Sequence, residues 1–176
     1  MSTTPDKICI LSPGRCGSLW LQSLLLVHYL DINKVKHTHL LDEALADESN
    51  GYTVITLRRQ NMLEWVLSYA VLDNIPQMNI TEQNTFHVNQ PEYTFYFSTD
   101  KYSKRRNWLR DQLQTYESHN WSQYNYEDLV ADQFAVLSNI LDYYIPSGAR
   151  SKLQYNKKTI VENYDELVNF ESNGIF

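Results

Sequence analysis

The sequence predicts an α/β fold in which a central parallel sheet is covered on both faces by helices. Short apolar segments alternate along the chain with longer segments of helical periodicity, and this order is typical of parallel strands joined by right-handed crossovers. The strand candidates Ile8–Leu11 and Thr53–Leu57 are almost continuously apolar, as strands covered on both faces are. The 176 residues contain no repeat and no low-complexity tract, and their number is sufficient for a single buried core.

The elements follow from these patterns in chain order. The apolar run Ile8–Leu11 predicts the first strand, and the leucines of Ser18–Tyr29 share one stripe of a helix. Further strands are expected at Val35–His39, Thr53–Leu57 and Trp121–Tyr126. Further helices are expected at Asn61–Val71, Asp100–Glu117, Gln133–Tyr144 and Ile160–Val168.

We expect one domain over residues 1–176, with a variable insertion around residues 72–100. The periodicity breaks down there, because the segment carries Pro76, Pro91 and several Asn and Gln residues. Its aromatic residues alternate at Tyr93, Phe95 and Phe97. The segment is therefore either a long irregular insertion or contains an edge strand.

The composition excludes several classes of partner. The formal net charge of −6 argues against nucleic acid, whose binding depends on Lys and Arg. The apolar run Leu19–Leu30 is interrupted by polar side chains, so we expect no signal peptide, no membrane partner and a cytoplasmic location. Cys9 and Cys16 are separated by an extended path, which favours free thiols in a reducing compartment. The basic cluster Lys104–Arg106 is interpreted as the solvated face of a helix.

The loop after the first predicted strand is a candidate anion site. Leu11–Trp20 reads LSPGRCGSLW, and its glycines, Gly14 and Gly17, permit positive φ angles and close approach of the backbone to a ligand. The helix that follows presents unpaired N–H groups, Arg15 adds a charge, and Ser18 adds a hydroxyl as N-cap and ligand. The lysine of the Walker A motif is missing. An ordinary turn with a helix cap would explain the glycines and the serine but not the arginine.

Two other segments carry groups suited to chemistry. In Leu57–Tyr69, Arg58 and Arg59 follow a strand and Ser68 lies two helical turns later; the arginines suit a phosphate, or are surface charge. In VKHTHLLDE, His37 and His39 share one face of a strand. A metal site would need a third ligand at a recognisable spacing. The simpler interpretations are that one of the two histidines is a general base, or that both are structural.

Taken in chain order, these segments resemble the sulfotransferases that use 3′-phosphoadenosine 5′-phosphosulfate (PAPS). PGRCGSLWLQSLL is similar to the family's 5′-phosphosulfate loop, and KHTHL with TVITLRR to its lysine-threonine-histidine strand and its 3′-phosphate arginine strand. YNYEDLVADQFAVLSNILDYY and LQYNKKTIVENYDELVN resemble later segments of carbohydrate and bacterial members. The resemblance implies a three-layer, P-loop-nucleotide-hydrolase-like fold, with residues 72–100 on the acceptor side.

The resemblance also implies roles for individual residues. The residues of the loop and the start of its helix would hold the 5′-phosphosulfate and the adenine side of PAPS: Gly14, Arg15, Cys16, Gly17, Ser18, Leu19 and Trp20. The 3′-phosphate would contact Ser68 and one of the two arginines, Arg58 or Arg59, with Lys157 or Lys158 as further candidates. His39 would be the catalytic base and Arg15 would stabilise charge. The family often has hydroxyl residues where Cys16 and Leu19 stand, and a lysine where His37 stands.

The implied reaction is transfer of a sulfuryl group from PAPS to a hydroxyl or amine, without a metal, leaving 3′,5′-adenosine bisphosphate. The acceptor is expected to be a small molecule or a saccharide, with a peptide tyrosine as an open alternative. Its pocket is expected to be either shallow or completed by a second copy in a homodimer. Two alternatives remain. One is a small nucleotide kinase or other phosphotransferase, and the other is a non-catalytic adenine-nucleotide-binding module.

Overall fold

The computed structural model describes residues 4–74, 94–142 and 161–173, and these form two compact units. The sheet unit comprises Met1–Gln60 and Asp111–Ser151, and the helical unit comprises Asn61–Arg110 and Lys152–Phe176. The chain passes repeatedly from one unit to the other, so the units do not correspond to two successive segments of the sequence. One of these passages lies inside a helix, α5. The prediction of a single domain over residues 1–176 stays a prediction.

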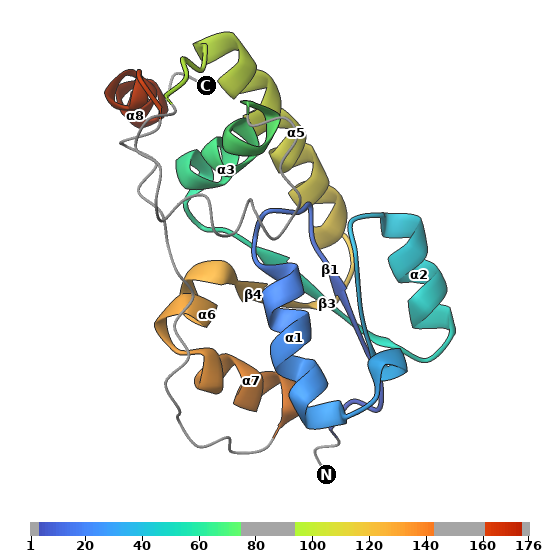
Figure 1. Ribbon diagram of the computed structural model, residues 1–176. Helices are drawn as coiled ribbons and strands as arrows, with labels where there is room; N and C mark the ends of the chain where they lie inside the picture. Colours follow the sequence, from blue (N-terminus) through green and yellow to red (C-terminus); the bar gives the residue numbers. More distant parts are fainter. Residues whose placement is uncertain (1–3, 75–93, 143–160, 174–176) are drawn as a thin grey trace. The chain divides into compact units, whose positions relative to one another are not determined.

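The sheet unit is an α/β fold with four parallel strands in the order β2-β1-β3-β4 (Figure 1). The strands are β1 (Ile8–Leu11), β2 (Val35–Thr38), β3 (Thr53–Arg58) and β4 (Ser122–Asn125). All four predicted strands are confirmed, with bounds that differ by one residue at most. The central strand β1 is fully buried along its length, because it pairs with β2 on one side and with β3 on the other.

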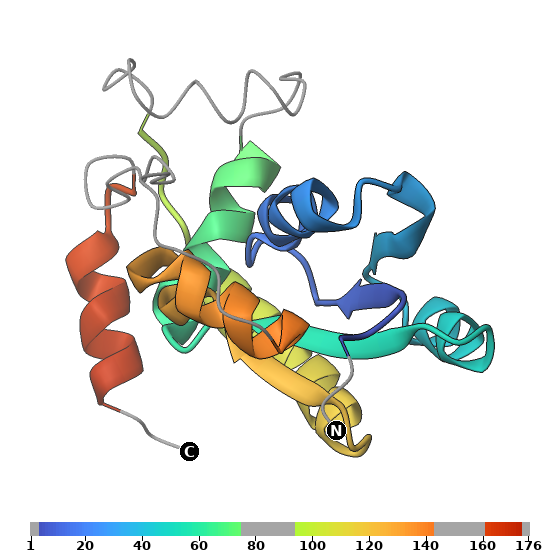
Figure 2. The ribbon, with the colours of Figure 1, turned by 90° about the horizontal axis from the view of Figure 1, so that it is seen from below.

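Helices flank this sheet on both faces (Figures 1 and 2). They are α1 (Ser18–Tyr29), α2 (Leu41–Ser49), α6 (Tyr126–Ala131), α7 (Gln133–Leu141) and the end of α5 (Thr99–Glu117), with a 3-10 turn, η1, at Ile32–Lys34. The α1 helix has the predicted bounds, whereas α2 was not predicted. Its sequence LDEALADES contributes only one buried side chain, Ala44, so the sequence shows no apolar periodicity that would predict a helix.

The core on one face of the sheet shows how strand alternation positions the helices. Cys9, Leu11 and Val54 form a buried cluster with Ala44 of α2 and Tyr116 of α5. The alternate positions in the strands point to the opposite face, which α1 and α7 cover (Figure 2). The crossovers from β1 to β2 and from β2 to β3 run in opposite directions, so right-handed connections place α1 and α2 on different faces.

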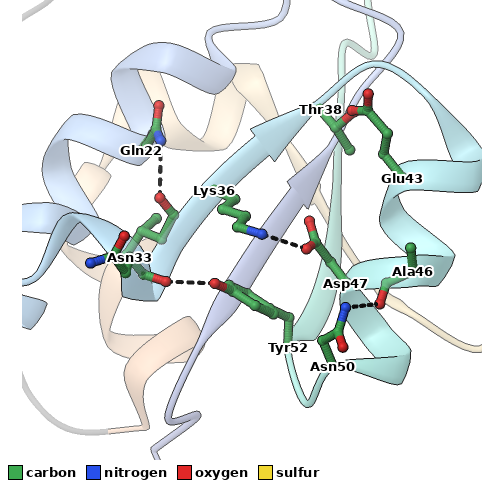
Figure 3. A network of polar contacts seen from close by, with 10 residues as sticks. Gln22, Asn33, Lys36, Thr38, Glu43, Ala46, Asp47, Asn50 and Tyr52 are labelled. Carbon is green, nitrogen blue, oxygen red and sulfur yellow. Dashed lines mark hydrogen bonds and ion pairs between the residues drawn. The ribbon is translucent and has the colours of Figure 1, made fainter.

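The open edge of β2 is tied to α2 and to its neighbours by polar contacts (Figure 3). Lys36 forms an ion pair with Asp47 at 2.7 Å, and its ammonium group lies 4.6 Å from the centre of the Tyr52 ring. The Tyr52 hydroxyl donates to the carbonyl oxygen of Asn33 at 2.6 Å. Desolvation of Cys9 beneath this network is the main reason that its pKa is raised to about 12. Both cysteines are buried and free, as predicted.

The helical unit contains α3 (Met62–Asn74), the first part of α5, and α8 (Tyr164–Ser172). The segment before α5 is joined to the one before α8: Phe95 forms a parallel bridge with Val161, and Asn163 exchanges hydrogen bonds with the Phe97 backbone at 3.0 and 2.9 Å. Most of the predicted insertion, including Pro76, Pro91 and Tyr93, lies outside the described residues.

The interpretation of Lys104–Arg106 as a solvated face is wrong for Arg106. Its side chain is 4 % exposed, and its Nε lies 3.0 Å from a carboxylate oxygen of Glu171 in α8. The same oxygen accepts a hydrogen bond from the Tyr102 hydroxyl at 2.7 Å. Burial, with this contact, raises the pKa of Tyr102 strongly. A buried arginine is compatible with folding here because a carboxylate meets it.

Candidate functional site

The strand order identifies where a ligand would bind on the sheet unit. The chain leaves β1 toward β2 and then returns to β3 on the other side of β1. In parallel sheets, ligands bind outside the carboxyl ends of the strands at such a reversal. The loop Ser12–Gly17 follows β1 at this point, and Arg59 follows β3.

The backbone of the loop is shaped as an anion cradle. Gly14, Arg15 and Gly17 have φ angles of 98°, 56° and 80°, all in the left-handed region. Only glycine adopts such angles without penalty, and an L-residue such as Arg15 loses about 1–2 kcal/mol there. Backbone N–H groups in a turn with such angles can point toward one place, and a concavity of this kind suits an anion.

The start of α1 differs in one respect from the prediction. Gly17 is the N-cap, and Ser18 is the first helical residue with a buried side chain. Ser18 therefore does not cap the helix. The first N–H groups of α1 still lack acceptors within the helix, and the positive end of its dipole faces the loop.

The underside of the loop is fixed by buried polar contacts. The N–H of Gly14 donates to the hydroxyl of the buried Ser12 at 3.3 Å. The thiol of Cys16, also buried, donates to the carbonyl oxygen of Leu57 at 3.2 Å and so joins the loop to β3. This contact explains a cysteine where the sequence alone gave no reason for one. Leu19 is 48 % exposed, and nothing in the structure explains it.

His39 is attached to the same loop. Its Nδ1 lies 2.9 Å from the carbonyl oxygen of Ser12 and 3.3 Å from the Ser12 hydroxyl. A carbonyl oxygen can only accept, so Nδ1 carries the proton and the neutral ring presents Nε2 as an acceptor. His39 itself is exposed. The structure thus brings the predicted base to the predicted cradle.

His37 is the less suitable of the two histidines. Its Nδ1 contacts the side-chain oxygen of Gln22 at 2.9 Å, and its ring centre lies 5.6 Å from that of His39. Burial, and then the charge of His39, lower the pKa of His37. A histidine that is partly buried and engaged with α1 serves packing rather than proton transfer.

Three residues that were not predicted as part of the site hold the backbone around His39. The Thr38 hydroxyl donates to the carboxylate of Glu43 (Figure 3). It also accepts the N–H of Leu40 at 3.1 Å. The Tyr116 hydroxyl donates to the His39 carbonyl oxygen at 3.4 Å. The signal for Glu43 was its place beside Asp42 after the histidines, where acidic residues favour a helix start.

The two arginines after β3 have different environments. Arg58 forms an ion pair with Glu117 at 2.7 Å and donates to Asn125 at 3.3 Å, so structural contacts hold it. The Arg59 guanidinium stacks over the Tyr126 ring at 4.1 Å, and the edge of Trp20 meets the same ring at 6.4 Å.

Arg59 also acts electrostatically on the loop. Burial raises the pKa of the Cys16 thiol to about 11, and the charge of Arg59 opposes that rise. The charge of Arg59 therefore acts on Cys16 within the loop.

The remaining predicted residues are not placed at the cradle. Ser68 belongs to the helical unit, where its buried hydroxyl contacts the carbonyl oxygens of Glu64 and Trp65 at 2.8 and 2.9 Å. Lys157 and Lys158 lie outside the described residues. A 3′-phosphate site built from Ser68 or from these lysines stays a prediction.

No family model and no curated protein matches the chain. The site is therefore argued from its own geometry. Among the described ranges, no three His, Cys, Asp or Glu side chains gather so as to hold a metal ion. In the same ranges, no helix is both long and apolar enough to span a membrane.

Proposed function

We propose that this protein is a sulfotransferase that uses PAPS as sulfuryl donor, on a three-layer, P-loop-like architecture. One observation carries the proposal. A left-handed anion cradle that contains Arg15 lies at the carboxyl end of β1, and His39 is hydrogen-bonded to the first residue of that cradle, Ser12. An anion cradle beside a histidine with an acceptor Nε2 suits group transfer between a bound anion and a hydroxyl or amine.

The residues present fit the phosphosulfate end of PAPS. N–H groups of the loop other than that of Gly14, which donates to Ser12, would hold the anionic end together with the Arg15 guanidinium and the Ser18 hydroxyl. Arg59 is the better candidate for a second cation, because Glu117 already engages Arg58. The half-buried Trp20 offers flat apolar surface nearby. When bound, PAPS would supply an activated sulfuryl group on a phosphate.

The side chains then have distinct tasks. His39 accepts the proton of the attacking hydroxyl or amine at Nε2, and the Ser12 carbonyl stabilises the resulting imidazolium through Nδ1–H. Arg15 and the loop N–H groups stabilise the negative charge that shifts toward the cradle. Thr38 and Glu43 keep the turn that carries His39 in place. The acceptor is a small molecule or a saccharide.

A thermal-shift comparison tests the nucleotide assignment. A ligand at a hundred times its dissociation constant adds about 2.7 kcal/mol to the free energy of unfolding. We expect a shift of about 5–10 °C with 3′,5′-adenosine bisphosphate and a much smaller shift with ADP or ATP. Arg15→Ala should remove the shift, whereas Lys34→Ala, an exposed cation paired with Asp6, should retain it.

The alternatives give different results in the same experiment. A shift with ATP that depends on Mg²⁺ would favour a nucleotide kinase. A non-catalytic nucleotide-binding module would bind 3′,5′-adenosine bisphosphate but would not produce it from PAPS, whichever hydroxyl or amine acceptor is supplied. Equal shifts for the wild type and Arg15→Ala would show that the nucleotide binds elsewhere.

A further inference from the structure

The helical unit contains a solvent-open cavity of about 340 Å³ between α5 and the C-terminal end of α3. We call it the basic pocket. The lining residues used below are Asp73, Phe97, Lys101, Lys104, Arg105 and Trp108. All of them belong to the helical unit, and none is a residue of the cradle.

The charge of the basic pocket is opposite to that of the chain. Lys101, Lys104 and Arg105 lie on one face of α5 at helical spacing, and Asp73 is the acidic residue among the lining residues named above. The chain as a whole carries a formal charge of −6. A local excess of cations on an acidic protein concentrates anions at that place.

These cations are engaged to different degrees. Arg105 forms an ion pair with Asp73 at 3.0 Å, and Lys104 pairs with Asp100 at 2.9 Å on an exposed surface. Exposed pairs of this kind are weak and exchange readily with other anions. The ammonium group of Lys101 makes no ion pair or hydrogen bond with the described residues. An incoming anion can therefore use Lys101 directly and Lys104 by exchange.

Aromatic rings give the pocket an apolar wall held in one orientation. The Arg105 guanidinium lies over both the Tyr69 and Trp108 rings, at 4.6 and 5.4 Å, and these two rings meet edge to face at 5.7 Å. Trp108 remains 38 % exposed, while Phe97 is 5 % exposed. A flat apolar surface of this kind favours a ring or the C–H face of a sugar.

We propose that the basic pocket binds a small organic anion with one flat apolar face, its acidic group on Lys101 and Lys104 and its flat face on Trp108. An aryl carboxylate and a uronic-acid sugar share this chemistry. The volume lies within the range of small-molecule sites, about 300–1,000 Å³. Basic side chains, an exposed aromatic ring and a cavity of sufficient volume occur together along one face of α5. This combination is the basis of the proposal.

Isothermal titration calorimetry on the full chain, with four probes, tests whether the basic pocket binds such an anion. Benzoate and methyl glucuronide carry both an acidic group and a flat face, acetate lacks the face, and methyl glucoside lacks the charge. We expect one or both of the first two to bind below about 10 mM and at least roughly tenfold more tightly than acetate or methyl glucoside. Whichever binds identifies the ligand as aryl or sugar.

Variants decide whether binding occurs in this pocket. Lys101→Gln and Trp108→Leu should each weaken binding roughly five- to twentyfold, because each removes one of the two recognised features. Lys34→Gln makes the same charge change in the sheet unit and should leave affinity unchanged. Circular dichroism of each variant shows whether the helices are intact.

Failure of the proposal has a clear form. The proposal is overturned if neither benzoate nor methyl glucuronide binds, or if both bind no more tightly than acetate. It is also overturned if the wild type and Lys101→Gln bind these two probes with equal affinity. None of these outcomes bears on the nucleotide shift predicted for the cradle, since the two sites share no residue.

Discussion

The buried contact between Arg106 and Glu171 gives a sharp prediction for the stability of the helical unit. Glu171→Ala removes the carboxylate that meets a guanidinium whose side chain is 4 % exposed, and leaves the Tyr102 hydroxyl without that acceptor. Breaking a buried pair by removing one partner costs about 3–5 kcal/mol, since the remaining charge stays desolvated. We expect a loss of this size in the free energy of unfolding.

Two further variants divide this loss between its causes. Tyr102→Phe removes only the hydrogen bond to the carboxylate and should cost about 1.5–3 kcal/mol. Arg106→Met/Glu171→Met/Tyr102→Phe replaces all three polar groups by apolar ones and should recover most of the stability, because no buried charge remains. Glu166→Ala, an exposed acid on the same helix, is the matched control.

Urea unfolding followed by tryptophan fluorescence measures the change, and hydrogen exchange of α8 locates it. Amides of Tyr164–Ser172 should lose protection in Glu171→Ala and keep it in Glu166→Ala. A loss below about 1 kcal/mol in Glu171→Ala, or one equal to that of the control, would refute the reasoning. The guanidinium would then be solvated rather than buried.

The site yields further predictions. Arg15→Gly and Arg15→Ala should both abolish the thermal shift by 3′,5′-adenosine bisphosphate. Denaturant unfolding should show that Arg15→Gly is more stable than Arg15→Ala by about 1 kcal/mol, since glycine tolerates the left-handed φ angle at this position. Equal stability of the two variants would argue against that angle. His39→Asn, whose amide can still donate to the Ser12 carbonyl, should keep the nucleotide shift and lower acceptor-dependent turnover about 10²–10⁴-fold; unchanged turnover would remove His39 as base. Cys9 and Cys16, with pKa values raised by burial to about 12 and about 11, should resist alkylation near about pH 8, where the thiolate fraction of Cys16 is roughly a hundredfold below that of a free thiol. These raised pKa values also predict a pH dependence of stability. The contribution of the buried neutral thiols to the free energy of unfolding should be complete below about pH 9 and should be lost as the pH rises through about 11–12. The melting temperature should therefore fall over this range, and it should fall less in Cys16→Ala.

The strands β1 and β3 and the α1 helix were predictable because apolar side chains mark them. β1 is apolar at every position, and α1 places its leucines at regular spacing, so periodicity alone marks both. The α2 helix was missed because it lies on the sheet through a single buried alanine. Local pattern cannot show an element that tertiary contacts hold in place.

The candidate site divides in the same way. The positive φ angles of Gly14 and Gly17 follow from their lack of a side chain, whereas that of Arg15 has no such signal. His39 lies next to the loop because parallel strands end at one edge of a sheet. Neither the Cys16 contact with Leu57 nor the attachment of Arg58 to Glu117 has a local signal, since both partners come from distant segments. The burial of Arg106 escaped for the same reason: its partner lies near the end of the chain.

The strand order has a consequence for how the protein is made. β1 pairs with β2 and β3, which are synthesised soon after it, whereas Arg58 of β3 meets Asn125 of β4 across 67 positions. Chain closure over such a distance is slower than the closures that join the first three strands. We expect a nascent chain to assemble the three-stranded part, with its anion loop, while β4 is still unmade. The fourth strand would then dock on a surface already formed, and with it would come Asn125, which holds Arg58.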